Sequence, residues 1–111
     1  MPIENWSDEV TIVHLSDDPQ FSEELDTFAM QNKSRSANVV LDMKAVQHIN
    51  SSNISQLLKL RKRSVADEKR MILCQMNNQV WGVFLVTGLD KVFEFADNVM
   101  LALATLQIEE S

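Results

Sequence analysis

Short apolar runs with strand character alternate along this chain with segments whose apolar residues recur at helical spacing. Val10–Leu15 is rich in β-branched residues, which is typical of a strand. Val39–Met43 is almost continuously apolar, so we expect a strand buried on both faces of a sheet that helices cover. This alternation favours an α/β fold, in the order β-β-α-β-α-β-α-β-α, whose sheet has a parallel core and right-handed crossovers.

Turn and capping residues bound the predicted elements. Ser16–Pro19 should stop the second strand and supply capping oxygens to the helix that follows. Lys33–Asn38 reads as a polar connection, Thr87–Gly88 should end the third helix, and Asp97 should cap the last helix. The predicted strands are Ile3–Trp6, Val10–Leu15, Val39–Met43, Met71–Met76 and Val92–Phe95. The first two lie close enough in sequence to form a hairpin.

Each predicted helix has an apolar face that should pack on the sheet. In the second helix, Ser51–Val65, Arg61 continues the apolar stripe. The first helix has Glu23, Glu24 and Asp26 near its N-terminus, where the helix dipole favours acidic side chains. The residues expected to point inward are Phe21, Leu25 and Phe28 in the first helix; Ile54, Leu57, Leu58 and Val65 in the second; Val80, Val83 and Phe84 in the third; and Val99, Ala102, Leu103 and Leu106 in the last. Val46 and Ile49 should point inward from the preceding connection.

Length and the scarcity of certain residue types exclude several classes of protein. The 111 residues fit one domain, residues 1–111, with a core that needs no disulfide or structural metal. Cys74 is the single cysteine, and its apolar neighbours indicate a buried, inert thiol. His14 and His48 have no partner at a metal-ligand spacing, so we expect no metal and no cofactor. The two glycines cannot form a phosphate-cradling loop.

The charge balance argues against two classes of partner. The formal net charge is −6, and an acidic chain repels phosphate backbones, so we expect no direct binding to nucleic acid. No apolar run reaches the roughly 18 residues of a membrane span, and Met1–Trp6 lacks the apolar core of a signal peptide. We therefore expect a cytoplasmic protein without membrane insertion.

The segment Gln47–Leu58 is the strongest candidate for function. Asn50, Ser51 and Ser52 lie where a loop that leaves a strand meets a helix, and functional groups of α/β sheets collect at the carboxyl ends of strands. A phosphate on a hydroxyl there would be favoured by up to about 1 kcal/mol by the helix dipole. Two simpler readings stay open: Ser and Asn are preferred helix caps, and the run is polar enough for an ordinary exposed loop.

The same helix carries a dense basic cluster late in its sequence. Lys59, Arg61, Lys62 and Arg63 stand out in an otherwise acidic chain. Cations are favoured near a helix C-terminus, which explains the cluster without a partner. The alternative is a stripe that docks an acidic surface.

At these residues the chain resembles the STAS family, the sulfate-transporter and anti-sigma-antagonist domain, over nearly its whole length. Val39–Met43 is similar to the central strand of the family, and Ile49–Leu58 to its Asp-Ser-Ser-Gly-Leu-Gly signature at the start of the second helix. Val80 with Val83-Phe84, followed by Thr87–Phe93, matches the third helix and the turn into the last strand, and Ala102-Leu103 matches the final helix. The resemblance implies a STAS-like domain with a mixed four- to five-stranded sheet and about four helices mainly on one face.

The resemblance also implies a function. In the antagonist branch, the serine after the signature Asp is phosphorylated by a serine kinase that is also an anti-sigma factor. The unphosphorylated antagonist binds that kinase and frees the sigma factor, and a PP2C-type phosphatase resets the switch. By position the acceptor here is Ser51, with Ser52 as second choice. The implied partner-binding residues are Asn50, Ser51, Ser52, Asn53, Ser55, Gln56 and Lys59.

This chain departs from the signature at two positions, because Asn50 replaces the Asp and Asn53 replaces a Gly. The first removes a negative charge beside the acceptor, and the second should place a side chain where a partner approaches. Both fit an alternative function, a STAS accessory or scaffold subunit that is not phosphorylated, for example in a transport complex. An enzyme would need His48 as base beside Ser51, with Asp42 as its acid; we predict no catalytic residues.

Overall fold

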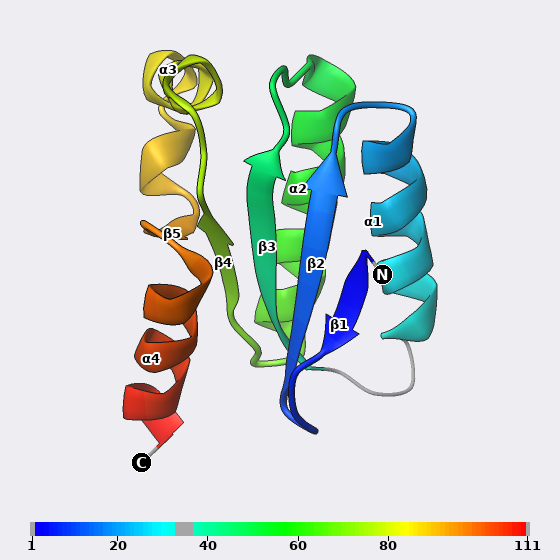
Figure 1. Cartoon of the computed structure of the whole chain (residues 1–111), viewed down its shortest axis with the longest axis vertical. Coiled ribbons are helices and arrows are strands. Elements are labelled where there is room, and N and C mark those ends of the chain that lie inside the picture. The colour runs from blue at the N-terminus through cyan, green and yellow to red at the C-terminus, as the bar shows by residue number, and fades with distance from the viewer. Residues whose placement is uncertain (1, 33–36, 111) are drawn as a thin grey trace.

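Five strands form one sheet whose order, β1-β2-β3-β4-β5, is the order of the chain (Figure 1). The computed structural model describes the backbone of residues 2–32 and 37–110, with side chains up to residue 107. The first strand runs antiparallel to the second, and the other neighbours are parallel, which confirms the hairpin and the parallel core. The strands are β1 (Ile3–Asn5), β2 (Val10–Ser16), β3 (Asn38–Ala45), β4 (Met71–Cys74) and β5 (Glu94–Ala96).

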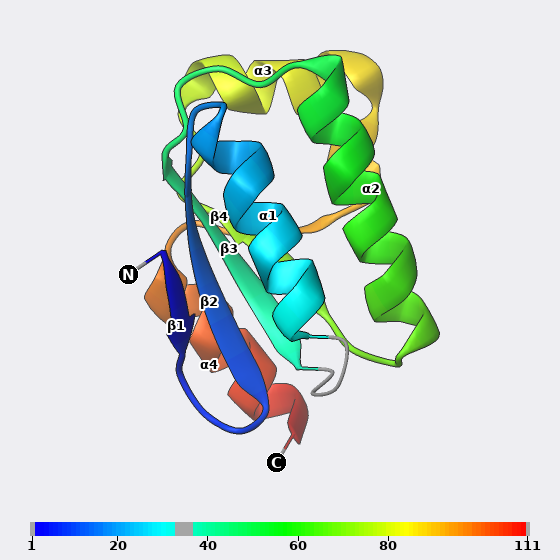
Figure 2. The ribbon, with the colours of Figure 1, turned by 90° about the vertical axis from the view of Figure 1, so that its right-hand side faces the viewer.

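Four helices connect these strands and cover the sheet unequally. Figure 2 shows α1 and α2 on one face of the sheet, α4 on the opposite face, and α3 across one end. The larger core cluster takes side chains from α1, α2 and α3, and the smaller one from α4. This is the predicted mixed sheet with helices mainly on one face. The helices are α1 (Gln20–Gln31), α2 (Ser51–Ala66), α3 (Asn78–Thr87) and α4 (Val99–Glu110).

β3 lies at the centre of the sheet and is buried on both faces, as predicted. Val39 and Leu41 pack into the cluster under α1 and α2, while Val40 packs under α4. All three side chains are fully buried, because successive residues of a strand point to opposite faces. The carboxyl end of β3 therefore emerges in the middle of one edge, where Val46 is again buried.

Two predicted strands are shorter in the structure and one is displaced. β1 ends at Asn5 instead of Trp6. β4 ends at Cys74 instead of Met76 because Gln75 adopts a φ of 59°, which does not continue a strand. The strand expected at Val92–Phe95 is instead Glu94–Ala96. A 3-10 turn at Leu89–Lys91 precedes it and holds the N–H of Val92 on the Leu89 carbonyl at 3.0 Å. Gly88 ends α3 in the left-handed region, as predicted.

The buried face of α2 differs from the expected one. Leu58 is 39% exposed and Val65 is 58% exposed, so the prediction that these two pack inward is wrong. Arg61 does not continue an apolar stripe but donates through Nε to the Val92 carbonyl at 2.8 Å. The face that α2 turns to the core is Asn53, Leu57, Leu60 and Ser64. Its spacing of four, three and four residues is that of one helix face.

Other boundary predictions are corrected in detail. Asp97 is not the cap of α4: the Leu101 N–H donates to Asn98 Oδ1 at 2.9 Å, one residue later. Only Glu23 of the three acidic residues lies in the first turn of α1. Of the expected connection Lys33–Asn38, residues 33–36 lie outside the described residues, and Asn38 already belongs to β3.

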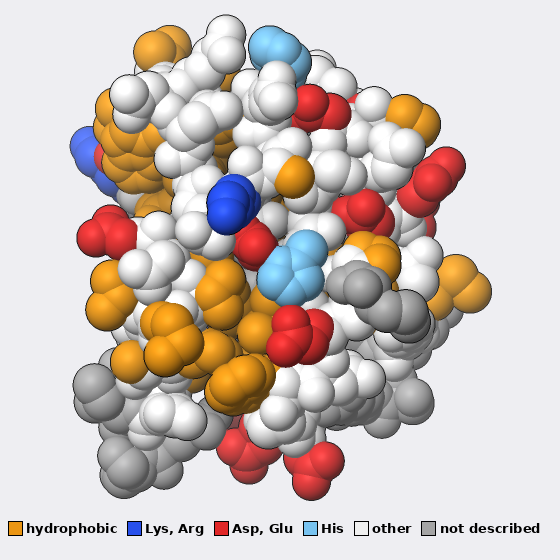
Figure 3. Space-filling model, in the orientation of Figure 1, with side chains coloured by type: hydrophobic (Ala, Val, Ile, Leu, Met, Phe, Trp, Pro, Cys, Tyr) orange, Lys and Arg blue, Asp and Glu red, His pale blue; other side chains and the backbone are white. Residues whose placement is uncertain are grey.

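Many apolar side chains are buried in the two clusters, and the large ones that stay exposed are spread over several elements. Cys74 is buried as predicted, and burial raises the pKa of its thiol to about 12, which makes it inert at neutral pH. Figure 3 shows that hydrophobic side chains nevertheless gather on the surface over α4 and the adjoining part of the sheet.

Candidate functional site

The candidate segment forms a tight corner where the connection from β3 enters α2. Asn50 is the helix cap, and its Oδ1 accepts the N–H of Asn53 at 2.8 Å. In return, the N–H of Asn50 donates to Asn53 Oδ1 at 3.2 Å. This reciprocal pair is a capping box built from two asparagines, with Asn53 in the place usually taken by Glu or Gln.

Ser51 and Ser52 form the first turn of α2 and take no part in this cap. Both side chains are exposed. By their position at the start of the helix, their N–H groups have no intrahelical acceptor. The capping explanation that the sequence left open therefore applies to Asn50. The hydroxyls of Ser51 and Ser52 do not cap the helix. An anion placed on either would meet the positive end of the helix dipole.

Asp18 brings a carboxylate from the turn before α1 into the same corner. Its Oδ2 accepts from Asn53 Nδ2 at 2.9 Å and from Asn50 Nδ2 at 3.3 Å. Its Oδ1 accepts from the N–H and the hydroxyl of Ser22. These hydrogen bonds, that from Asn53 first, lower the pKa of Asp18 below its usual value, so the corner carries a negative charge at neutral pH.

Asp17 fixes the loop on the other side of the corner. Its Oδ1 accepts from the N–H groups of Gln47 and His48 at 2.8 and 3.2 Å. The sequence predicted only a strand stop and capping oxygens from Ser16–Pro19. It missed that Asp17 binds the connection before α2 and that Asp18 binds the cap of α2 and its first turn. The signal was available, because the carboxyl ends of neighbouring parallel strands meet at one edge of a sheet.

The seven residues expected to bind a partner differ in how far they are exposed to solvent. Asn53 is 2% exposed, so the expectation that its side chain stands in a partner's way is wrong: Asp18 and Asn50 hold it inside the corner. Gln56 is half-buried, and its Oε1 accepts from the Ser22 hydroxyl at 3.2 Å. The exposed ones are Asn50, Ser51, Ser52, Ser55 and Lys59.

A groove of about 310 Å³ runs between α1 and α2 below this corner. Lys59 and Arg63 line it, and an Arg63 nitrogen donates to the Ala29 carbonyl of α1 at 3.4 Å. Arg61 points to the other side of α2. The basic cluster is thus divided between two sides of the helix. Besides the two basic residues, the lining consists of Leu25, Asp26, Ala29, Gln56 and Leu60.

The elements of a hydrolytic site do not come together in the described part of the chain. No hydrogen bond joins His48 to Ser51 there, and Asp42 pairs with the other histidine. His14 Nδ1 lies 2.7 Å from Asp42 Oδ2, and its Nε2 lies 3.1 Å from Glu4 Oε1. Burial lowers the pKa of His14, but the hydrogen bonds and charges of the two carboxylates outweigh it and raise that pKa.

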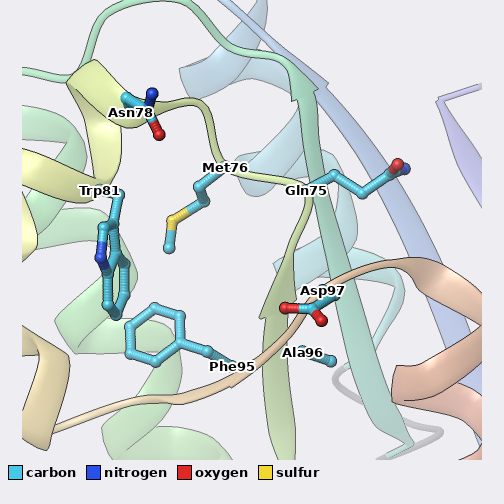
Figure 4. A pocket seen from close by; sticks show the side chains of 7 residues that line it. All are labelled: Gln75, Met76, Asn78, Trp81, Phe95, Ala96 and Asp97. Atoms are coloured by element: carbon cyan, nitrogen blue, oxygen red, sulfur yellow. The ribbon is translucent and has the colours of Figure 1, made fainter.

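A second hollow, of about 270 Å³, opens at the carboxyl ends of β4 and β5. Figure 4 shows Trp81, Phe95 and Met76 around it, with the Asp97 carboxylate on the opposite side. The Trp81 and Phe95 rings meet edge to face with centroids 5.0 Å apart. None of the predicted site residues lines this hollow, so it is separate from the corner around Ser51.

No set of three metal-ligating side chains comes together within residues 2–32 and 37–107. Among the described helices, none combines the length and apolar character needed to cross a membrane.

Comparison with known proteins identifies relatives of this fold. The family model described as STAS domain matches residues 3–102. An anti-sigma-factor antagonist (STAS) domain protein from Planctomyces limnophilus superposes with a TM-score of 0.80 at 22% identity, covering 95% of this chain and 97% of that one. A serine-to-glutamate variant of RsbS from Moorella thermoacetica gives 0.76 at 19%, covering 100% of both.

The anti-sigma factor antagonist SpoIIAA, in its unphosphorylated form, gives a TM-score of 0.68 at 15% identity and covers 96% of each chain. At such identities the likeness to solved structures concerns the fold alone. No curated protein matches this chain.

Proposed function

Because this chain belongs to the STAS domain family, we propose that it is an anti-sigma factor antagonist whose binding to an anti-sigma serine kinase is switched by phosphorylation. Unphosphorylated, it binds the kinase and thereby frees a sigma factor for transcription. When Ser51 is phosphorylated, the protein dissociates from the kinase. A PP2C-type phosphatase then removes the phosphate and restores the binding form. The protein is then a signalling module of the bacterial cytoplasm and not an enzyme.

One observation carries the proposal: the exposed Ser51 hydroxyl stands at the start of α2, while Asn50 and Asn53 do the capping. A kinase can reach such a hydroxyl without unwinding the helix, since no cap depends on it. Ser52 is equally exposed and is the second choice, because only Ser51 directly follows the position of the signature Asp. Asp18, hydrogen-bonded to Asn50, supplies a carboxylate to the corner from the turn before α1.

The charge of a phosphate is sufficient for switching. A phosphoserine adds about −1.5 to −2 charges at neutral pH, next to Asn50, which is hydrogen-bonded to the Asp18 carboxylate, and on a chain of net charge −6. The helix dipole stabilises it within the free protein. In a complex, the same charge would lie inside the interface, where like charges or lost hydration cost several kcal/mol. No change of shape is required.

The partner-facing surface continues from Ser51 along the outer side of α2. Ser55 and Lys59 are exposed at intervals of four residues, which places them on one stripe of the helix with Ser51. Gln56 borders the groove between α1 and α2. We propose that the kinase covers this stripe, with Ser51 near the centre of the contact.

The test combines phosphorylation and binding on the full chain. Each anti-sigma serine kinase encoded in the source genome is incubated with the protein and ATP, and the modified residue is mapped by mass spectrometry. Binding to the same kinase is measured by calorimetry for Ser51→Ala and Ser51→Asp. We expect modification at Ser51, retained binding by Ser51→Ala without modification, and at least tenfold weaker binding by Ser51→Asp.

Two matched variants separate the position from the charge. Ser52→Asp adds the same charge one residue further on and should weaken binding less than Ser51→Asp. Asn5→Asp adds it on β1, where the oxygen that accepts from the Thr11 hydroxyl is kept, and should leave binding unchanged. If no kinase modifies or binds the chain, the proposal is wrong. A partner captured equally by wild type and Ser51→Asp would instead establish the accessory-subunit alternative.

A further inference from the structure

Three basic side chains line one hollow beside the second half of α2, which we call the basic hollow. It has a volume of about 210 Å³ and includes the first residues of β4 and β5. Arg61 comes from α2, and Lys69 and Arg70 come from the connection between α2 and β4. All three are half-buried, although basic side chains are mostly exposed. The other lining residues are Ser64, Val65, Met71, Val92, Phe93 and Glu94.

Only one of these three cations is paired with a carboxylate in the part of the chain that the structure describes. Arg70 forms an ion pair with Glu94, to which its Nε donates at 3.1 Å. Arg61 donates through Nε to the neutral Val92 carbonyl, which leaves the guanidinium charge uncompensated. Lys69 forms no ion pair with any described residue. Three cations and one carboxylate therefore leave an excess of two positive charges in the basic hollow, in a chain of net charge −6.

Neighbouring negative groups do not cancel this excess. Asp67 and Glu68 precede Lys69 in the chain but do not line the basic hollow. The carboxyl end of α2 has a partial charge of about −0.5, which is less than two full charges. Its Ser64 carbonyl already accepts the Lys69 N–H at 2.8 Å, and its Val65 carbonyl accepts the Glu68 N–H at 3.0 Å. The basic hollow therefore attracts anions.

The amount and the placement of this charge indicate a phosphate group. A phosphate monoester has about −1.5 to −2 charges at neutral pH, which matches the excess. Its oxygens can accept from cations that come from different elements, as Arg61 and Lys69 do. A planar carboxylate is best matched by the fork of one guanidinium, and Glu94 already occupies that fork at Arg70.

Apolar side chains in the same lining indicate that the ligand also has a carbon body. Val65 is 58% exposed, and Phe93 contributes an aromatic ring. The volume is below the roughly 300–1,000 Å³ of sites for drug-sized molecules. We propose that the basic hollow binds a small organic phosphate ester through Arg61 and Lys69. This inference does not depend on the proposed function, because Arg61 lies ten positions after Ser51, about 15 Å further along α2.

The test is a titration of the isotope-labelled full chain with phenyl phosphate in a phosphate-free buffer, followed by the backbone N–H signals in NMR spectra. We expect a dissociation constant below about 1 mM, which rises as NaCl is increased from about 0.05 to 0.5 M because salt screens the charges. The signals of Lys69–Met71 should shift, and those of Ser51 and Ser52 should not. Phenyl sulfate, which has one negative charge, and benzoate, which has a planar carboxylate, should bind at least tenfold more weakly.

Matched variants separate this site from the general charge of the chain. Lys69→Gln removes one of the two excess charges and should weaken binding of phenyl phosphate at least tenfold. Arg61→Lys keeps its charge and should bind more tightly than Arg61→Gln. The control is Lys62→Gln, the same change at an exposed side chain of α2 outside the basic hollow, which should leave binding unchanged. Circular dichroism spectra establish that the variants are folded.

Several results would overturn the inference. One is the absence of shifts at Lys69–Met71 up to about 10 mM phenyl phosphate. Another is binding of phenyl sulfate or benzoate as tight as that of phenyl phosphate. Shifts at Ser51 and Ser52 instead of Lys69–Met71 would place the anion at the start of α2. Equal weakening by Lys69→Gln and Lys62→Gln would show that the whole chain's charge, and not the basic hollow, attracts the ligand.

Discussion

Replacing Asn53 with alanine should lower the free energy of unfolding by about 2 kcal/mol. The side chain is 2% exposed and makes two good hydrogen bonds. It accepts the N–H of Asn50 at 3.2 Å and donates to the Asp18 carboxylate at 2.9 Å. A further contact to Gln56 at 3.5 Å is too long to count for much.

The magnitude follows from these partners. A neutral hydrogen bond contributes about 0.5–1.5 kcal/mol and one to a charged group about 1.5–3 kcal/mol. The second figure is reduced here because Asp18 is exposed and water can replace Asn53. Alanine regains up to about 0.7 kcal/mol through its higher helix propensity. The balance is about 2 kcal/mol, or roughly 8 °C in Tm for a chain of this size.

Urea unfolding followed by tryptophan fluorescence and circular dichroism measures the change, with an unchanged m-value as the check on two-state behaviour. Asn98→Ala is the control, because it removes a cap with one hydrogen bond and should cost only about 1 kcal/mol. A double-mutant cycle with Asp18→Ala should give a coupling energy of about 1 kcal/mol. If Asn53→Ala costs less than Asn98→Ala, or if the coupling is zero, the assignment of Asn53 as the centre of the corner is refuted.

Three further predictions concern other parts of the fold. The raised pKa of His14 means that its ion pairs stabilise the protein fully below the ordinary value of 6.5 and lose this effect as pH rises through the raised pKa. Urea melts of His14→Gln should therefore show a deficit, under about 1 kcal/mol for so exposed a group, that disappears at alkaline pH. Trp81→Ala should cost about 2–3 kcal/mol in thermal melts through lost packing on Phe95. Gly82→Ala should stabilise the protein and Gly88→Ala should destabilise it, each by about 1 kcal/mol. An added Cβ has no neighbour within 4 Å at either site, and of the two glycines only Gly88 has a positive φ, of 76°. Equal shifts of the denaturant midpoint in the two variants would contradict this.

The order of elements could be predicted because it depends on local pattern. The buried central strand, the hairpin and the end of α3 at Gly88 each follow from neighbouring residues. The start of α2 at Ser51 was also predicted correctly. These are features in which propensity, turn chemistry and apolar spacing agree.

The buried face of α2 could not be predicted, because it depends on what packs against it. The run Leu57–Leu60 contains three leucines around a lysine, and periodicity alone allows more than one apolar face. Asn53 looked like a surface residue, since its partner Asp18 lies 35 positions earlier in the chain. A buried polar side chain needs a hydrogen-bond partner such as Asp18. Local sequence patterns do not reveal which distant residues come into contact in the fold.

The strand order has a consequence for how this protein folds. Because the strands lie side by side in the order in which they are synthesised, each new strand finds its neighbour already present as the chain leaves the ribosome. No pairing has to wait for a segment from the far end of the chain, because paired residues of neighbouring parallel strands lie 22 to 32 positions apart, which limits the loop-closure entropy that each pairing costs. The two borders of the sheet, β1 and β5, are three residues each, too short to act as templates for aggregation.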